Sequence, residues 1–279
     1  MTSRTVLITG CSTGIGRACA ERLARAGHTV YATARRLESI DDLRSAGCRT
    51  LALDVTDEGS MRAAVEAVEA EQGAVGALVN NAGYSQSGAI ETVAMDDLRR
   101  QFETNVFGLV RMCQLVLPGM RARGDGRIVN MSSMGGNFTF PGGGAYHASK
   151  YAVEAISDAL RFEVEGFGVG VSVIQPGTIR TEFSATAVGE IEEGDGPYAT
   201  FNAEVARATR EAYEKGPLAR LGGEADDVAK AVEKAITAAR APVRMRVTPS
   251  AHLLVTQRRL MPDRVWDRFL ATQFKRPRA

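Results

Sequence analysis

The sequence predicts an α/β fold: a doubly wound parallel sheet of the Rossmann type, with about seven strands and helices on both faces. Three observations predict it. Short apolar runs rich in Val, Ile and Leu alternate with longer segments of helical periodicity. The gaps between the runs are long enough for a helix and its turns, as parallel neighbours require. The first run also leads directly into a glycine cluster, which is typical of a tight turn from a strand into a helix.

Each element follows from this alternation. The seven predicted strands are the runs at residues 5–9, 29–33, 50–55, 77–83, 127–133, 171–177 and 243–248. Gly27 and Gly73 end two of the helical segments, where a left-handed cap is expected. The helical segment that starts at Met95 is expected to end at about Leu117, before Pro118. Neither a repeat nor a linker divides the chain, so residues 1–279 are predicted to form a single domain.

Two segments depart from the alternation. Residues from about 182 to 223 are rich in Glu, Gly and Ala, and we expect them to form a substrate lid. The sequence leaves open whether the aromatic residues of this segment line an apolar pocket or pack the lid onto the body. They are Phe183, Tyr198, Phe201 and Tyr213. The C-terminal extension, about 250–279, is either an amphipathic surface helix or docks onto the domain or a partner subunit; docking is favoured.

Composition excludes several classes of function. The 34 Lys and Arg residues balance the 33 Asp and Glu residues, and the net charge of +1 gives no overall attraction for nucleic acid. The chain has no uninterrupted apolar run of about 18 residues, so we expect no membrane span. Its four cysteines show neither a C-x-x-C pair nor metal-ligand spacing. We therefore expect no metal site, free thiols, no leader sequence and a cytoplasmic location.

The glycine cluster "TGCSTGIG" is the first candidate site. Gly10, Gly14 and Gly16 open the first helix, where backbone N–H groups and the helix N-terminus can approach a pyrophosphate. The second strand is followed by Arg35 and Arg36 rather than by a carboxylate. A guanidinium binds a ribose 2′-phosphate, so Arg35 favours NADP(H) over NAD(H), unless both arginines are ordinary solvated charges. Further polar groups at strand ends are Asp54, beside which an adenine is expected, and the "NNAG" segment.

Tyr146 and Lys150 form the second candidate site. Residues four apart share one helix face, so both side chains can reach one site. A tyrosine pKa near ~10 is a poor match for proton transfer at neutral pH. A neighbouring ammonium would favour the phenolate and so lower that pKa. Ser133 precedes them at a strand end, and its hydroxyl can hydrogen-bond a substrate oxygen.

These motifs together resemble the short-chain dehydrogenase/reductase family. The matching segments are "TGCSTGIG", "NNAG", "TNVFG", "SS" before the glycines, "YHASK" and "PGTIRT", in the order of the family, over about the first 240 residues. The finer similarity is to estradiol-type hydroxysteroid and retinol dehydrogenases. The resemblance implies a catalytic tetrad of Asn105, Ser133, Tyr146 and Lys150, in which Asn105 helps to hold a water of a proton relay. Including the positions argued above, the expected cofactor contacts are Gly10, Ser12, Thr13, Gly14, Ile15, Gly16, Arg35, Asp54, Val55, Asn81, Ala82, Gly83, Tyr146, Lys150, Pro176, Gly177, Ile179 and Thr181.

Three functions remain open. The first is an NADP(H)-dependent oxidoreductase that transfers a hydride between nicotinamide and the carbonyl or secondary alcohol of a bulky apolar molecule, such as a steroid-like, retinoid-like or polycyclic one. The second is a ketoreductase for a polyketide or acyl-thioester ketone. The third is a nonenzymatic redox sensor that binds NADP(H). The resemblance also implies a homodimer or homotetramer, paired through the fourth and fifth helices of the family.

Overall fold

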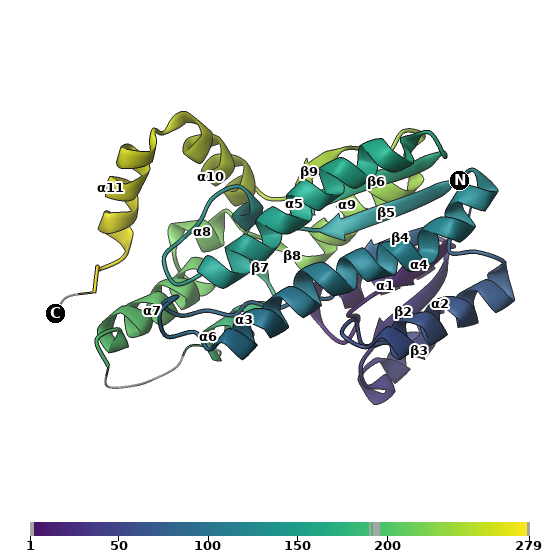
Figure 1. The fold of residues 1–279 in the computed structure, drawn as a ribbon, viewed down its shortest axis with the longest axis horizontal. Coiled ribbons are helices and arrows are strands. Elements are labelled where there is room, and N and C mark those ends of the chain that lie inside the picture. Colours follow the sequence, from purple (N-terminus) through teal and green to yellow (C-terminus); the bar gives the residue numbers. More distant parts are fainter. Residues whose placement is uncertain (1–2, 190, 192–195, 278–279) are drawn as a thin grey trace.

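A parallel sheet of seven strands lies at the centre of the computed structural model, which describes residues 3–189, 191 and 196–277 (Figure 1). The strand order is β3-β2-β1-β4-β5-β6-β9, and every neighbouring pair is parallel. All seven predicted strands are present, and the predicted fold class is confirmed. Their bounds are β1 (Thr5–Ile8), β2 (Thr29–Ala34), β3 (Arg49–Ala52), β4 (Ala77–Asn80), β5 (Gly126–Met131), β6 (Val169–Gln175) and β9 (Arg244–Arg246).

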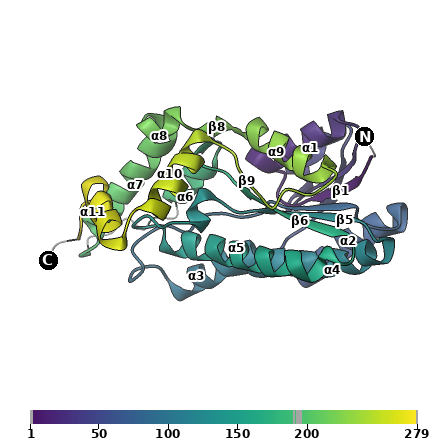
Figure 2. The ribbon, with the colours of Figure 1, turned by 90° about the horizontal axis from the view of Figure 1, so that it is seen from above.

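Helices cover both faces of this sheet (Figure 2). One face carries α1 (Gly14–Arg25), η1 (Leu37–Arg44) and α9 (Ala225–Thr237). The opposite face carries α2 (Glu58–Gln72), α4 (Gly108–Arg123) and α5 (Gly144–Glu165). Successive residues of a strand point to opposite faces, so Val6 and Ile8 enter the first core whereas Leu7 enters the second. Burial on both faces explains why the strands are continuous apolar runs.

The helical segment that begins at Met95 differs from the prediction. It comprises α3 (Met95–Phe102), a π-helical turn (η2, Glu103–Phe107) and α4, which continues through Pro118 to Arg123. The expected end before Pro118 is therefore wrong. An interior proline costs about 3 kcal/mol. Pro118 is exposed, however, and continuing the helix buries Met120 completely against the sheet. The helix ends instead at Gly124, which has a left-handed φ of 66°.

The remaining elements gather beyond the carboxyl ends of the strands (Figures 1 and 2). They are η3 (Met134–Gly136), α6 (Phe183–Gly189), α7 (Ala199–Glu214), α8 (Pro217–Arg220), α10 (Pro249–Leu260), α11 (Asp263–Gln273) and a small sheet of β7 (Ile179–Arg180) and β8 (Gly223–Glu224). The expected lid spans α6 to α8, although its residues 190 and 192–195 lie outside the described part. The C-terminal extension docks onto the domain, as expected, because Trp266 is 4% exposed within a separate apolar cluster.

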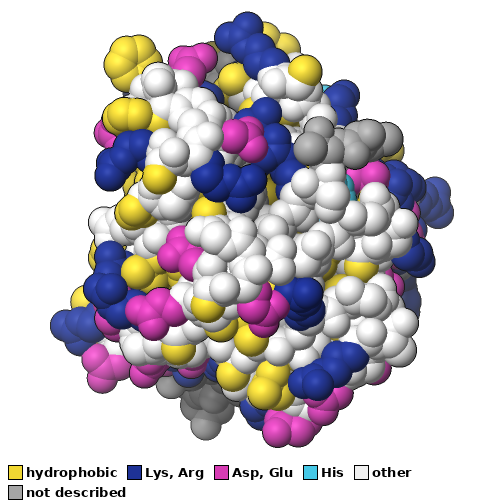
Figure 3. All heavy atoms as spheres, turned by 90° about the vertical axis from the view of Figure 1, so that its right-hand side faces the viewer, with side chains coloured by type: hydrophobic (Ala, Val, Ile, Leu, Met, Phe, Trp, Pro, Cys, Tyr) yellow, Lys and Arg dark blue, Asp and Glu magenta, His cyan; other side chains and the backbone are white. Residues whose placement is uncertain are grey.

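Charge is evenly distributed where the surface is in view. At the end of the molecule with the N-terminus, acidic and basic side chains alternate without a continuous basic tract (Figure 3). Among the described helices, none is both long and apolar enough to cross a membrane. The four cysteines are free and buried, as expected.

Candidate active site

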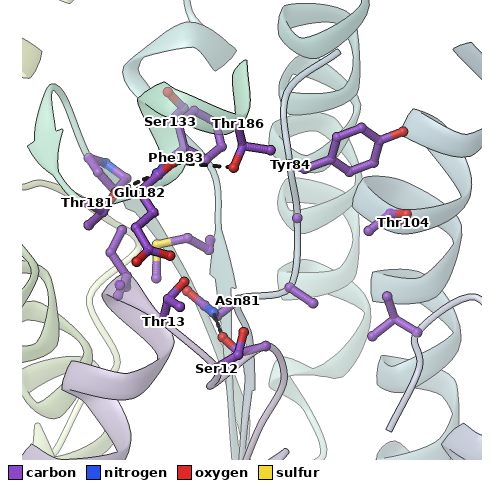
Figure 4. Close-up of a pocket in the computed structure, with 18 of the residues that line it drawn as sticks. Ser12, Thr13, Asn81, Tyr84, Thr104, Ser133, Thr181, Glu182, Phe183 and Thr186 are labelled. Carbon is purple, nitrogen blue, oxygen red and sulfur yellow. Dashed lines mark hydrogen bonds between the residues drawn. The ribbon is translucent and has the colours of Figure 1, made fainter. Parts of the chain in front are cut away.

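A cavity of about 550 Å³, here called the first cavity, lies where the carboxyl ends of β1 to β6 meet. Ser12, Thr13 and Asn81 line one end of it, and the segment that follows β6, including Thr181 and Phe183, lines the other (Figure 4). Every predicted cofactor contact except Gly16 lines this cavity. The carboxyl edge of an open parallel sheet is where such folds bind ligands, and this explains why residues far apart in sequence meet here.

The glycine-rich turn after β1 is held in place by an amide side chain. The Nδ2 of Asn81 donates to the carbonyl oxygens of Thr9 (3.0 Å) and Gly10 (2.9 Å). Gly16 has no room for a side chain, because an added Cβ would lie 2.1 Å from the Gly10 oxygen. Gly16 therefore lets the first turn of α1 sit directly on this loop, with the N–H groups of the helix start beside the cavity. This cradle fits a pyrophosphate group.

Arg35 is the cation at the outer side of the first cavity. It follows β2, is exposed and lines the cavity, whereas the neighbouring Arg36 does not line it. Within the described part of the chain, no carboxylate lies within ion-pair distance of Arg35. Arg17, by contrast, is held by Asp42 and by the carbonyl oxygen of Ser12. Arg35 is thus the guanidinium that is available to an anion bound in this cavity.

Ser133 and Tyr146 lie together at the inner end of the first cavity. Ser133 follows β5, and its Oγ accepts a hydrogen bond from the Gly135 N–H at 3.0 Å, which fixes the side chain. Tyr146 lies in the first turn of α5. The Ser133 hydroxyl lies within hydrogen-bonding reach of the phenol and acts to lower its pKa. A substrate oxygen placed between these two hydroxyls would therefore meet both of them.

The pKa of Tyr146 differs from the expectation. Burial raises it to about 12, and this effect exceeds the opposite effect of Ser133. Lys150, which was expected to lower it, lies with its Nζ 5.8 Å from the Tyr146 ring centroid and donates to the Met131 carbonyl oxygen at 2.8 Å. Burial also lowers the pKa of Lys150 to about 8. The ammonium is thus directed to the end of β5 rather than to the phenol oxygen, and Tyr146 is protonated at neutral pH.

Glu154, one turn after Lys150 on α5, supports the lysine. Its charge favours the ammonium form and partly offsets the effect of burial on the Lys150 pKa. Glu154 is itself buried and accepts hydrogen bonds from Gln175 Nε2 (2.9 Å) and Arg244 Nε (2.8 Å). These bonds satisfy a carboxylate that would otherwise be costly to bury.

Asn105 is buried and does not line the first cavity. It lies in the π-helical turn, and its side chain bonds to both backbone groups of Tyr84 and, at 3.0 Å, to the Ser149 hydroxyl. Because its side chain is already bonded, Asn105 can take part in a proton relay only through its backbone. A π-turn alters the direction of backbone carbonyls and is frequent at functional sites.

A second cavity, also of about 550 Å³, opens from the same hydroxyl pair. Ser133, Tyr146, Phe183 and Tyr213 line both cavities and form their junction. The body of the second cavity is largely apolar, with walls from η3, α7, α10 and α11. These walls include Met134, Phe140, Val205, Leu218, Leu254, Phe269 and Phe274.

Several lining residues had no assigned role in the sequence. Phe183 packs on Tyr146 with ring centroids 5.6 Å apart, and Tyr213 reaches the junction from α7. Tyr198 and Phe201 pack against each other in a satellite apolar cluster instead. The four aromatic residues are thus divided between the two roles. Their spacing in the sequence did not separate them, because it does not show which part of the body α7 faces.

Comparison with known proteins agrees with this arrangement. Residues 4–191 match the short chain dehydrogenase family. The chain is 33% identical over 283 residues to the NADPH-dependent 3-dehydrocapnine reductase of Ornithobacterium rhinotracheale, covering 98% of each chain. It is 43% identical over 185 residues to the 3-ketodihydrosphingosine reductase of Bacteroides thetaiotaomicron, covering 66% of this chain and 67% of the relative.

Solved structures show the same relationship. A short-chain dehydrogenase from Streptomyces avermitilis superposes with a TM-score of 0.81 at 36% identity, covering 96% of this chain and 95% of the other. Structures of this fold contain NADP+ in one case and NAD in another, so the fold alone does not choose between the two cofactors. By its sequence, its sheet and these relatives, the chain belongs to the short-chain dehydrogenase/reductase family of oxidoreductases.

Proposed function

We propose that this protein is an NADP(H)-dependent oxidoreductase that transfers a hydride between nicotinamide and the carbonyl or secondary alcohol of a bulky apolar molecule. The observation that carries the proposal is the position of Ser133 and Tyr146, where a cavity that suits a dinucleotide meets a more apolar one. A bound nicotinamide would supply or accept the hydride. The protein would have to hold the substrate oxygen and move its proton.

The catalytic roles follow from the chemistry of each group. Tyr146 gives its proton to the substrate oxygen as a ketone is reduced, because its raised pKa keeps the phenol protonated at neutral pH. Ser133 orients that oxygen with a second hydrogen bond. Lys150 would hold the ribose of the cofactor, and its positive charge would stabilise the phenolate that Tyr146 becomes when it gives up its proton. The backbone of Asn105 completes a relay that returns a proton to the site.

The preference for NADP(H) rests on Arg35. No carboxylate of the described residues competes for its guanidinium, and a 2′-phosphate is the ligand that a guanidinium binds with charge-assisted hydrogen bonds. Three further expected cofactor contacts line the same cavity, namely Asp54, Val55 and Asn81. The NADPH dependence named for one relative also supports this choice.

The substrate class rests on the second cavity. Its aromatic and aliphatic walls favour burial of apolar surface, at roughly 25 cal/mol per Å². We further propose a cytoplasmic location, which the four free thiols support, and a homodimer or homotetramer. Phe107, Tyr151 and Phe162 support the pairing, because they expose apolar surface on α4 and α5.

The decisive experiment follows NADPH and NADH consumption by the purified protein with steroid, retinoid, polycyclic and β-keto thioester ketones. We expect turnover with NADPH and a loss of about 10²- to 10⁴-fold in Tyr146→Phe, the usual contribution of a general acid. Arg35→Ser should lower kcat/KM for NADPH by about 10- to 100-fold, as loss of a charge-assisted bond does, with little effect on NADH. Arg36→Ser is the matched control.

Each alternative has its own outcome in this assay. Preference for the thioesters would identify a ketoreductase of the polyketide or acyl-thioester type. Tight NADPH binding without turnover of any ketone would favour the redox sensor. Equal use of NADH and NADPH, unchanged in Arg35→Ser, would contradict the role of Arg35 and leave the catalytic roles standing.

A further inference from the structure

Tyr213 contributes a third hydroxyl to the junction of the two cavities. Of the four residues that line both cavities, two are Ser133 and Tyr146, and the other two, Phe183 and Tyr213, belong to the lid. Phe183 has no polar group, so Tyr213 is the lid residue that can hydrogen-bond there. It lies near the end of α7.

Tyr213 lines the same junction as Tyr146 and leaves its hydroxyl available to a bound molecule. The two phenols interact electrostatically, and this interaction, together with burial, raises the pKa of Tyr213. Within the described part of the chain, no hydrogen bond of the Tyr213 hydroxyl is formed. Tyr213 is half-buried, and its side chain faces the junction of the two cavities, so a molecule bound there is the partner that its hydroxyl can find.

The number of hydrogen bonds that a carbonyl oxygen can accept limits which substrate group can pair with the Tyr213 hydroxyl. Such an oxygen has two lone pairs, and Ser133 and Tyr146 are placed to occupy both. The Tyr213 hydroxyl therefore has no acceptor site left on the reacting oxygen. At the junction, the nearest remaining position for its hydrogen bond is a polar group on the neighbouring carbon of the substrate.

We propose that Tyr213 is a specificity-determining residue, whose hydroxyl hydrogen-bonds a polar substituent on the carbon next to the reacting carbonyl. This inference rests on the proposed function and names its substrate class more narrowly, as an apolar ketone with an α-hydroxyl, an α-amine or a second carbonyl. An analogue that lacks the substituent would cover the Tyr213 hydroxyl without pairing it, and a polar group left unpaired by a bound substrate is a strong basis for discrimination.

The test compares two ketones of the same shape. 1-Hydroxy-2-decanone and 3-undecanone differ in one position, where the hydroxyl of the first is a methyl group in the second. Wild type and Tyr213→Phe are assayed for kcat/KM with both ketones at saturating NADPH. The phenylalanine variant keeps the ring, so a change in the ratio of the two values reports the hydroxyl alone. The intrinsic reactivity of each ketone cancels in this comparison.

We expect wild type to prefer the hydroxyketone, and Tyr213→Phe to reduce that preference by at least tenfold. Tyr198→Phe is the matched control, because Tyr198 is a lid tyrosine whose hydroxyl donates to Glu91 at 2.7 Å and lies outside both cavities. The dissociation constant for NADPH, measured by fluorescence, confirms that each variant is folded.

Two results would overturn the inference. An unchanged ratio in Tyr213→Phe, with both ketones still reduced, would show that Tyr213 is only part of the apolar wall, and the proposed function would stand. Absence of turnover with these ketones and with the whole panel would reject the proposed function, and the inference would fall with it.

Discussion

His147 shows how one side chain next to the active site can be structural. It is buried, its Nδ1 lies 2.8 Å from the Gly135 carbonyl oxygen, and the Phe140 N–H donates to its Nε2 at 3.3 Å. These two contacts require the neutral imidazole with its proton on Nδ1. The ring thus ties the start of α5 to the loop after Ser133.

The pH dependence of stability follows from this arrangement. Burial lowers the pKa of His147 below its ordinary value of 6.5. The unfolded chain therefore binds a proton at higher pH than the folded one, and stability is lost as the pH falls below about 6.5. We expect His147→Asn to be less stable than wild type at pH 7.5 by about 1–3 kcal/mol, the cost of leaving buried partners unpaired.

That difference should narrow between pH 7.5 and pH 5, because wild type alone carries the titrating imidazole. Urea unfolding of both proteins at pH 7.5 and pH 5 measures the difference in their free energies of unfolding. A difference that widens toward pH 5 would mean that the folded protein protonates His147 and would contradict the neutral ring.

At the scale of elements, the sequence predicts the helices and strands that have a regular apolar pattern or a clear boundary residue. The strands were recognisable because both faces of the sheet are covered, which makes each strand a continuous apolar run such as Val6 to Ile8. The site residues Gly10, Arg35, Asn81 and Ser133 meet because each follows a parallel strand. The run of α4 through Pro118 was missed, because local propensity disfavours it and only the burial of Met120 against the sheet favours it.

Tyr213 and the C-terminal wall could not be predicted for a different reason. The position of Tyr213 depends on how α7 packs: the helix has a buried face with Phe201 and Val205, but its sequence does not show what lies opposite the end that carries Tyr213. The wall residue Phe274 lies far from Tyr146 in sequence, and only the tertiary structure places both at the second cavity. The motifs therefore indicated the reaction, whereas the substrate-binding surface required the structure.

Helix α5 also carries the prediction about assembly. Tyr151 and Phe162 are eleven residues apart, three turns along one helix face, and are 44% and 86% exposed. Phe107 exposes a further aromatic ring at the start of the neighbouring α4. Large apolar side chains on adjacent exposed helices are typical of a subunit interface.

We expect wild type to elute as a dimer or tetramer in size-exclusion chromatography with light scattering, and Phe162→Glu to shift it toward the monomer. A buried charge at the centre of such an interface costs several kcal/mol. Leu260→Glu is the control, because Leu260 is 79% exposed on α10, which is not one of the helices of the proposed face. A wild-type monomer, or an unchanged assembly in Phe162→Glu, would exclude pairing through this face.

The molecule as a whole has two unequal parts: the sheet with its two helical layers, and a smaller cap whose core is separate. The cap cluster joins Trp266 of α11 to Phe138 and Phe140 of the loop after η3, with ring centroids 5.7 and 6.4 Å apart. That loop lies next to Ser133 and His147. The C-terminal extension thus closes the second cavity and at the same time braces the loop that precedes Tyr146.

Trp266→Ala tests this coupling. Removal of a buried tryptophan should destabilise the cap by about 3–5 kcal/mol, and the loss should appear as early exchange of α10 and α11 amides in hydrogen exchange. Because the glycine-rich turn lies in the other part, we expect the NADPH dissociation constant to stay within about twofold, while KM for a long apolar ketone rises about tenfold or more. Val265→Ala, a half-exposed neighbour on the same helix, should leave both unchanged. If Trp266→Ala weakened NADPH and ketone binding equally, the two parts would be a single cooperative unit and the extension would not be a substrate wall in its own right.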